Sequence, residues 1–208
     1  MKKQGCSRDW HSDAIGILSL SMKSIPLALL TSLLCSLPGL AVTIEGVQVP
    51  EKTTLSGTPL SLNGTAVRVF RWLGIPVKIY VAAFYTPAPL RSAKEVMASP
   101  GPMQFDFTFL RDVSKDQVAE AWSKQISQSV DFTYDGFDSD RDRFVGMFGA
   151  LKSGGTQTVQ FVGPDTIIID QGAKKGTIAG RNFQKAFLSM WFGGTPVSPE
   201  IKAGLLGK

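Results

Sequence analysis

Residues 67–87 read VRVFRWLGIPVKIYVAAFYTP, and this stretch decides the fold. Residues 65–72 and 76–86 are rich in valine, isoleucine, phenylalanine, tyrosine and tryptophan, a composition typical of β-strands. Only Leu-Gly-Ile, residues 73–75, lies between them. The sequence therefore predicts two long antiparallel strands joined by a three-residue loop.

The length of this loop predicts the register of the two strands. Position 72 then lies opposite 76, 70 opposite 78 and 68 opposite 80. Directly opposed residues share a face of the sheet, so Arg68 and Tyr80 are expected to point the same way. Phe70, Lys78, Ala82 and Phe84 fall on the same face. The other face is expected to take the helices, and it carries Val67, Val69, Val77, Ile79 and Val81.

The flanking sequence predicts a sheet with helices on one side. Short extended pieces are expected at 43–49 and 59–62, and further strands at 103–110, 156–162, 166–170 and 176–178. Helices are expected at 91–98, after a capping box at 114–117, from residue 140, around 183–191 and from residue 198. Most strands follow one another through short turns, which indicates a mainly antiparallel sheet. The predicted class is α+β, with a helical layer covering the sheet.

The N-terminal part has the layout of a secretory signal. Residues 25–37, IPLALLTSLLCSL, follow a lysine and precede the small residues Gly39 and Ala41. This pattern predicts cleavage after Ala41, so that 1–41 is a signal region and 42–208 the working domain. The alternative is a membrane anchor, but the run is shorter than the ~20 residues that span a bilayer. We expect a periplasmic or secreted protein of a bacterial envelope, with no stable membrane span after removal of the signal.

Removal of this signal region changes the chemistry open to the chain. It takes away four bases and two acids, so the formal net charge falls from +5 to +3, too weak for a nucleic-acid interface. It also removes His11, Cys6 and Cys35, which are the only histidine and cysteines. The working domain therefore lacks the groups for a Ser-His-Asp triad, a cysteine nucleophile or an ordinary zinc site. Residues 1–21 show no pattern, and Met22 is an alternative start.

Two further patterns resemble ligand sites but do not match them. Residues 138–142, DSDRD, resemble the start of a calcium loop, yet Arg143 stands where that loop needs glycine and Gly149 where it needs glutamate. A solvated helix start, with acids at its N-terminal end, explains the cluster better. Gly172, Gly176 and Gly180 have the wrong spacing for a phosphate loop. No metal and no cofactor are expected.

Arg68 and Tyr80 form an unusual polar pair between two long apolar strands. A guanidinium offers forked donors to a carboxylate or phenolate, and a tyrosine hydroxyl can add another. In a cleft with apolar walls, the pair would hold the head of an amphipathic acid. Alternatively, a nearby acid or carbonyl groups satisfy the arginine, and Tyr80 is an ordinary cross-strand partner. The residues alone favour this second interpretation.

Three stretches in this order resemble the chalcone isomerase-like domain family in its bacterial exported form. They are VRVFRWLGIPVKIYVAAFYTP (67–87), FTFLRDVSKDQVAEAW (107–122) and GRNFQKAFLSMWFGGTPVSPEIKAGLLG (180–207). The resemblance spans nearly all of the predicted working domain. It implies an open-faced β-sandwich, with a long antiparallel sheet under a layer of helices and a ligand cleft between them.

The resemblance also implies roles for individual residues. In plant chalcone isomerases an arginine in the first long strand and a threonine in the next help to cyclise a chalcone. Arg68 matches that arginine, but Tyr80 occupies the threonine position, and residues 113–116 hold no counterpart of the catalytic tyrosine. Ser189 matches a small hydroxyl residue of the flavonoid pocket. Arginine with tyrosine is instead similar to the non-catalytic, fatty-acid-binding branch, whose members hold a carboxylate with those two side chains.

Three functions are therefore carried forward. The first is a non-catalytic exported domain that binds a fatty acid or similar amphipathic carboxylate through Arg68, Tyr80 and Ser189. The second is an intramolecular lyase or isomerase that acts on a phenolic or enone substrate and stabilises an oxyanion at Arg68. The third is an envelope structural or interaction protein whose cleft is filled by its own side chains.

Overall fold

A computed structural model describes residues 40–130 and 133–208, and the predicted signal sequence up to residue 39 lies outside them. The strands are β1 (Ala41–Ile44), β2 (Val47–Pro50), β3 (Lys52–Leu55), β4 (Thr58–Trp72), β5 (Ile75–Thr86), β6 (Met103–Phe109), β7 (Thr156–Val162), β8 (Asp165–Asp170) and β9 (Ala173–Ile178). The helices are α1 (Ala93–Ala98), α2 (Lys115–Ser129), α3 (Phe137–Gly146), α4 (Arg181–Phe192) and α5 (Pro199–Leu205). None of these helices is long and apolar enough to span a bilayer.

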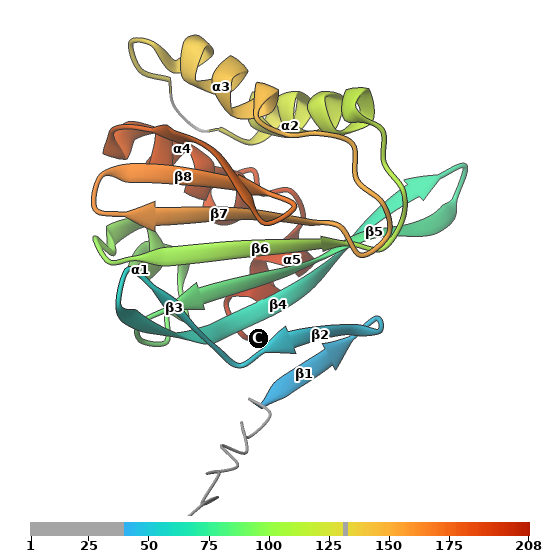
Figure 1. The fold of residues 1–208 in the computed structure, drawn as a ribbon, viewed down its shortest axis with the longest axis horizontal. Coiled ribbons are helices and arrows are strands. Elements are labelled where there is room, and N and C mark those ends of the chain that lie inside the picture. The colour runs from blue at the N-terminus through green and yellow to red at the C-terminus, as the bar shows by residue number, and fades with distance from the viewer. Residues whose placement is uncertain (1–39, 131–132) are drawn as a thin grey trace, which may run out of the picture. The chain divides into compact units, whose positions relative to one another are not determined.

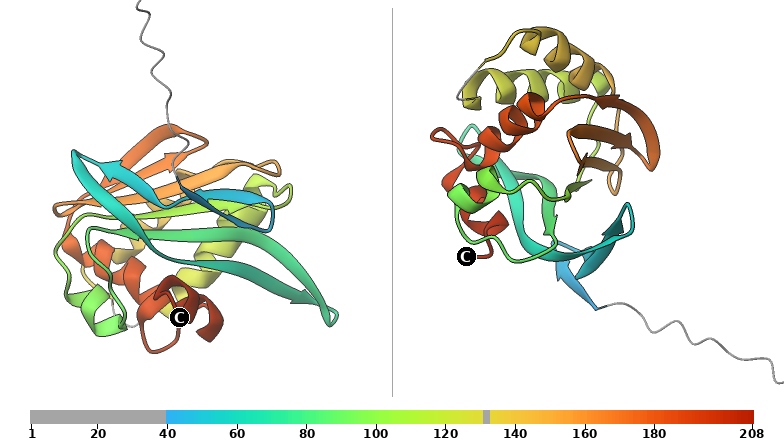
Figure 2. Two further views of the ribbon diagram at one scale, coloured as in Figure 1. Left: turned by 90° about the horizontal axis from the view of Figure 1, so that it is seen from below. Right: turned by 90° about the vertical axis from the view of Figure 1, so that its left-hand side faces the viewer.

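Strands β3 to β9 form one antiparallel sheet in which each strand lies beside its neighbour in sequence. The helices lie over one face of this sheet (Figures 1 and 2), and β1 and β2 form a separate hairpin on the other side. The predicted α+β class, with a mainly antiparallel sheet under a helical layer, is confirmed. Short turns join β3 to β4, β4 to β5, β7 to β8 and β8 to β9, and these turns indicated the antiparallel pairing in the sequence.

Several element boundaries differ from the prediction. Residues 43–49 are divided between two strands by a turn at Glu45 and Gly46, and β3 was not expected at all. The pieces expected at 59–62 and 65–72 are one strand, β4. The strand continues past residues 63 and 64, with a bulge between Leu62 and Gly64, because it pairs with β5 along this stretch. Tertiary pairing here overrides local turn propensity.

The predicted loop and register of β4 and β5 are wrong near the turn and correct farther along. Leu73 and Gly74 have φ angles of 49° and 82°, which makes a two-residue hairpin turn, and position 70 pairs with 77 instead of 78. A β-bulge follows, because one extra residue, Ile79, lies between the partners of positions 69 and 68. The bulge compensates for the shorter turn. Arg68 therefore pairs with Tyr80, as predicted.

The face of the sheet expected to take the helices is wrong for Val67 and Val81, whereas Val77 and Ile79 do lie on the helix side. Tyr80, Ala82 and Phe84 point toward the helices, into the main core. Val67 and Val81 face the other side, where they join a smaller core with residues of β2 and β3. Volume explains the difference, since large aromatic side chains of β5 and β6 fill the layer between sheet and helices. The strand expected at 103–110 is present as β6, and its alternate residues Met103, Phe105, Phe107 and Phe109 all lie in the main core.

The capping box predicted for α2 is present at its start. The Ser114 side chain accepts a hydrogen bond from the Gln117 backbone amide at 3.2 Å, and the Gln117 side chain accepts one from the Ser114 amide at 2.9 Å. These bonds satisfy two backbone donors that a helix start leaves open. The cap therefore fixes where α2 begins.

Replacement of Ser114 by alanine is expected to lower the free energy of unfolding by about 1 kcal/mol, because the first turn of α2 loses its cap. Urea denaturation of the variant and the wild type measures this difference. Ser127→Ala, at an exposed position of the same helix, is the control and should leave stability unchanged or slightly raised. Equal stability of the two variants would contradict the capping role.

Candidate functional site

A cleft of about 620 Å³ lies between the sheet and α2. Its volume falls within the range of about 300–1,000 Å³ that is usual for small-molecule sites. Strands β4, β5 and β6 supply its floor with Arg68, Phe70, Val77, Ile79, Tyr80, Phe107 and Phe109. Helix α2 supplies the opposite wall with Gln117, Val118, Glu120, Ala121, Trp122, Lys124, Gln125 and Gln128.

The structure brings Arg68 and Tyr80 together in this cleft. They are direct cross-strand partners, and such partners have Cβ atoms about 4.5–5.5 Å apart. The bulge turns both Ile79 and Tyr80 toward the cleft, where a regular strand would place them on opposite faces. Within residues 40–130 and 133–208, no side chain or backbone group forms a hydrogen bond with the Arg68 guanidinium or the Tyr80 hydroxyl. Both donors therefore remain available to a ligand.

Tyr80 is held among aromatic rings. Its ring centroid lies 5.4 Å from that of Phe107, nearly edge-on, and 5.5 Å from that of Phe109. Burial raises the pKa of the Tyr80 hydroxyl above its ordinary value, and the nearby positive charge of Arg68 offsets only part of this rise. The phenol is therefore neutral at physiological pH and able to donate a hydrogen bond.

All three tyrosines of the chain should titrate above the ordinary pKa of about 10, since burial raises the pKa of Tyr80, Tyr85 and Tyr134. A spectrophotometric titration of the folded protein should show no phenolate step near pH ~10, whereas the urea-unfolded chain should show one. The unfolded state then binds fewer protons above this pH, so stability should fall as pH rises through ~10. A tyrosine of the folded protein that ionises with the ordinary pKa would contradict the burial argument.

The inner end of the cleft is apolar and rigid. Trp191 of α4 is 1% exposed and packs against Phe107 with a centroid distance of 5.5 Å. Trp122 of α2 is fixed by a hydrogen bond from its Nε1 to the Gln157 Oε1 at 3.2 Å. An acyl chain or another apolar group fits such surroundings, since aromatic rings make up most of this end of the cleft.

The rim of the cleft is charged. Arg111 and Lys124 lie there with Glu120 and Asp112. Asp112 is occupied by Lys152, whose Nζ lies 2.7 Å from its carboxylate, and this pair holds the pKa of Asp112 below its usual value. The cleft thus has a charged rim, a cationic side chain, Arg68, on its floor and an apolar inner end, and this arrangement matches an elongated ligand with one polar head.

Ser189 lies in α4, apart from the other two predicted site residues. It is buried, and its hydroxyl donates a hydrogen bond to the Ala186 carbonyl oxygen at 2.7 Å. It is not among the residues that line the cleft. Lys78 does not share the face of Arg68 as the predicted register required, because the shorter turn moves it to the other face, where it pairs with Glu45 at 2.7 Å.

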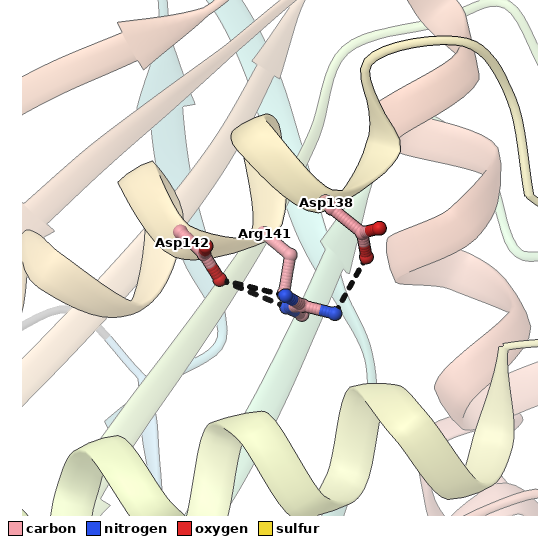
Figure 3. A network of polar contacts seen from close by, with 3 residues as sticks. All are labelled: Asp138, Arg141 and Asp142. Atoms are coloured by element: carbon pink, nitrogen blue, oxygen red, sulfur yellow. Dashed lines mark hydrogen bonds and ion pairs between the residues drawn. The ribbon is translucent and has the colours of Figure 1, made fainter.

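The acidic cluster at 138–142 forms ion pairs at the start of α3. Arg141 lies between Asp138 and Asp142, at 2.6 and 2.9 Å from their carboxylates (Figure 3). Asp140 accepts a hydrogen bond from the Tyr134 hydroxyl at 2.8 Å. These carboxylates thus have partners in the protein. In the part of the chain that the structure describes, no three histidine, cysteine, aspartate or glutamate side chains gather as a metal site requires.

A smaller hollow of about 170 Å³ lies on the other face of the sheet, beside β2. Its acid, Asp106, accepts hydrogen bonds from Gln104 and Thr158, and burial raises its pKa. Because these neighbours already form hydrogen bonds with Asp106, its carboxylate is less available to a ligand than the Arg68 and Tyr80 donors of the cleft. The cleft with Arg68 and Tyr80 is therefore the candidate site.

Comparison with known proteins adds two findings. A family model described as chalcone isomerase-like matches residues 41–207. The structure is similar to the crystal structure of a fatty-acid binding protein of Arabidopsis thaliana, with a TM-score of 0.64 and 14% sequence identity over 80% of this chain and 96% of that chain. At this identity the likeness concerns the fold. No curated protein matches the sequence.

Proposed function

The chain belongs to the chalcone isomerase-like family, and on this basis we propose that it is a non-catalytic domain that binds a fatty acid or a similar amphipathic carboxylate. The observation that carries the proposal is the pair of Arg68 and Tyr80 in the cleft, with no partner for either polar group in the described residues. The fatty-acid binding of the Arabidopsis protein with the similar fold adds support.

The chemistry of the pair suits a carboxylate head. Arg68 supplies a permanent positive charge and two parallel donors, and Tyr80 supplies a third donor that stays protonated. Phe107, Trp122 and Trp191 offer the apolar surface that the acyl chain needs. Hydrogen bonds hold the head while burial of the tail provides most of the affinity.

We further propose that the domain works in the bacterial envelope after export. The apolar run at 25–37 and the small residues at 39 and 41 support removal of the N-terminal segment. The proposed cleavage falls after Ala41, the first residue of β1, so the mature chain would retain every other residue of the fold. N-terminal sequencing of the protein recovered from the periplasm tests this step, and an intact N-terminus would overturn it.

Native mass spectrometry tests the binding function. Protein purified from cells, and delipidated protein incubated with palmitate, should both carry an added mass that matches one fatty acid per chain. Denaturing extraction followed by lipid analysis identifies the bound acid. An unliganded protein under both conditions would refute the proposal and would favour an interaction protein without a ligand.

An isomerase is the second candidate, because Arg68 also lies where it could stabilise an oxyanion in the cleft. Tyr80 would then donate to the developing phenolate or enolate, and its raised pKa keeps it protonated for that role. The test is cyclisation of a chalcone followed by absorbance. A rate above buffer that Arg68→Met removes would support catalysis, and a rate equal to buffer would exclude this substrate class.

A further inference from the structure

The far end of the β4–β5 hairpin is an apolar tip that leaves the sheet. Strand β5 pairs with β6 only from Tyr80 onward, and the Ile79 carbonyl oxygen accepts a hydrogen bond from the Leu110 amide just beyond β6, so among the described strands residues 75–78 pair with β4 alone. The hairpin therefore extends beyond the neighbouring strands (Figures 1 and 2). At its end Leu73 is 84% exposed, Ile75 62% and Phe70 48%. These three residues are called the hairpin tip below.

The turn itself carries an apolar residue where polar ones are favoured. Leu73 has a φ of 49°, a conformation that suits asparagine or aspartate and costs energy for a bulky side chain. The turns that begin at Glu45, Ser56 and Gln171 have the same positive φ before a glycine, and all three begin with a polar residue. Leu73 is thus both conformationally unfavourable and exposed, which folding alone does not explain.

The charge around the hairpin tip is positive. Residues 58–86, which comprise β4, the turn and β5, contain Arg68, Arg71 and Lys78 and no acid. Arg71 is exposed, and Lys78 is exposed beside Glu45. An apolar end flanked by bases matches an anionic lipid surface, where apolar side chains enter the interface and bases contact the headgroups.

The hairpin tip also continues into the cleft. Phe70 and Val77, near the turn, line the same cleft as Arg68 and Tyr80. A ligand leaving the cleft beside these two residues would reach the hairpin tip first. This geometry links a lipid surface to the candidate site without any large movement of the fold.

We propose that the hairpin tip docks on a bilayer that contains anionic phospholipid, and that the cleft exchanges its ligand with that bilayer. The docking step stands on the hairpin alone, whereas the exchange step rests on the proposed function. Leu73, Ile75 and Phe70 enter the interface, and Arg71 contacts phosphate groups, whereas Lys78 is paired with Glu45.

Leu73→Asp is the variant of choice, because aspartate suits the φ of this position and should leave the hairpin folded. The chain is purified in the form that cells accumulate and is sedimented with vesicles of phosphatidylcholine, with or without phosphatidylglycerol. Wild type should sediment with the phosphatidylglycerol vesicles, and Leu73→Asp should bind them at least about tenfold more weakly. Gln171→Asp, at the corresponding position of another turn, is the matched control and should bind like wild type.

Added salt should weaken wild-type binding to the vesicles, and Arg71→Gln should reduce this salt dependence.

Absence of wild-type binding to the vesicles, or equal binding by Leu73→Asp, would overturn the proposal. Self-association that Leu73→Asp abolishes, without vesicle binding, would assign the hairpin tip to a second copy and would equally overturn it. Binding of palmitate in the absence of vesicles is measured in parallel and should be the same for wild type and Leu73→Asp. Vesicle binding without palmitate binding would refute the proposed function and the exchange step that rests on it, and would leave the docking step standing.

Discussion

Replacement of Gly64 by alanine is expected to destabilise the domain by about 3 kcal/mol or more, because the new methyl group has no space. A Cβ atom at this position would lie 2.6 Å from the carbonyl oxygen of Leu205 and 2.7 Å from its carbonyl carbon, closer than real Cβ contacts. Gly204 faces β4 from the other side, where its own Cβ would lie 3.1 Å from the Cβ of Ala66. The backbones of strand β4 and helix α5 are thus in direct contact. A backbone cannot move aside to make room for a methyl group as a flexible side chain can.

The bulge residue beside Gly64 depends on the same close approach. The Asn63 side chain donates to the Leu205 carbonyl oxygen at 2.8 Å and to the Leu90 carbonyl oxygen at 3.0 Å, and it accepts from the Leu90 amide at 2.7 Å. Because these groups are buried, loss of the contact would leave several of them without partners. Displacement of α5 by Gly64→Ala therefore costs more than the clash alone.

Thermal and urea unfolding of Gly64→Ala measure this effect. Gly146→Ala is the control, since a Cβ there meets no atom within 4 Å and the residue ends α3 in an ordinary helical conformation. That control should raise stability slightly, by up to about 1 kcal/mol, because alanine favours the helix. A free energy of unfolding for Gly64→Ala within experimental error of the wild-type value would show that α5 and β4 can separate at no cost.

The sheet could be predicted from sequence because its strands follow one another, and local patterns therefore sufficed. The alternation in β6 and the capping box of α2 depend only on residues a few positions apart. The continuity of β4 through Gly64 depends instead on α5, which lies about 140 positions later in the chain. From sequence alone, a glycine that permits close backbone packing, such as Gly64, cannot be distinguished from a glycine in a turn.

The candidate site shows the same limit. The pairing of Arg68 with Tyr80 was predicted, but the predicted three-residue loop is a two-residue turn, and the bulge at Ile79 restores the pairing. The dipeptide Leu73-Gly74 does signal such a turn, although leucine is an unusual first residue for it. Nothing in the residues around Ile79 indicates a bulge. The resemblance implied a cleft between sheet and helices, but no pattern in the sequence marked Val118 and Trp122 of α2 as part of its wall.

Arg68→Met should weaken palmitate binding by about 10- to 150-fold, since hydrogen bonds to a charged group contribute about 1.5–3 kcal/mol. Methionine keeps much of the length and the apolar stem of arginine, so the packing beside Phe70 should survive. Arg71→Met is the matched control, because Arg71 lies three positions along the same strand and does not line the cleft. It should bind palmitate in solution like the wild type.

Tyr80→Phe extends the argument to the second member of the pair. It removes one neutral donor and should weaken binding by about 2- to 10-fold, which corresponds to about 0.5–1.5 kcal/mol. If both side chains hold one carboxylate, the double variant should lose less binding free energy than the sum of the two single losses, because each single variant already weakens the contact that the other side chain makes with the head.

Ser189→Ala should leave palmitate binding unchanged, because the Ser189 hydroxyl is bonded to the Ala186 carbonyl oxygen and lies outside the cleft lining. Titration calorimetry with palmitate measures the five variants against the wild type, and wild-type affinity in Arg68→Met would remove the arginine from the site.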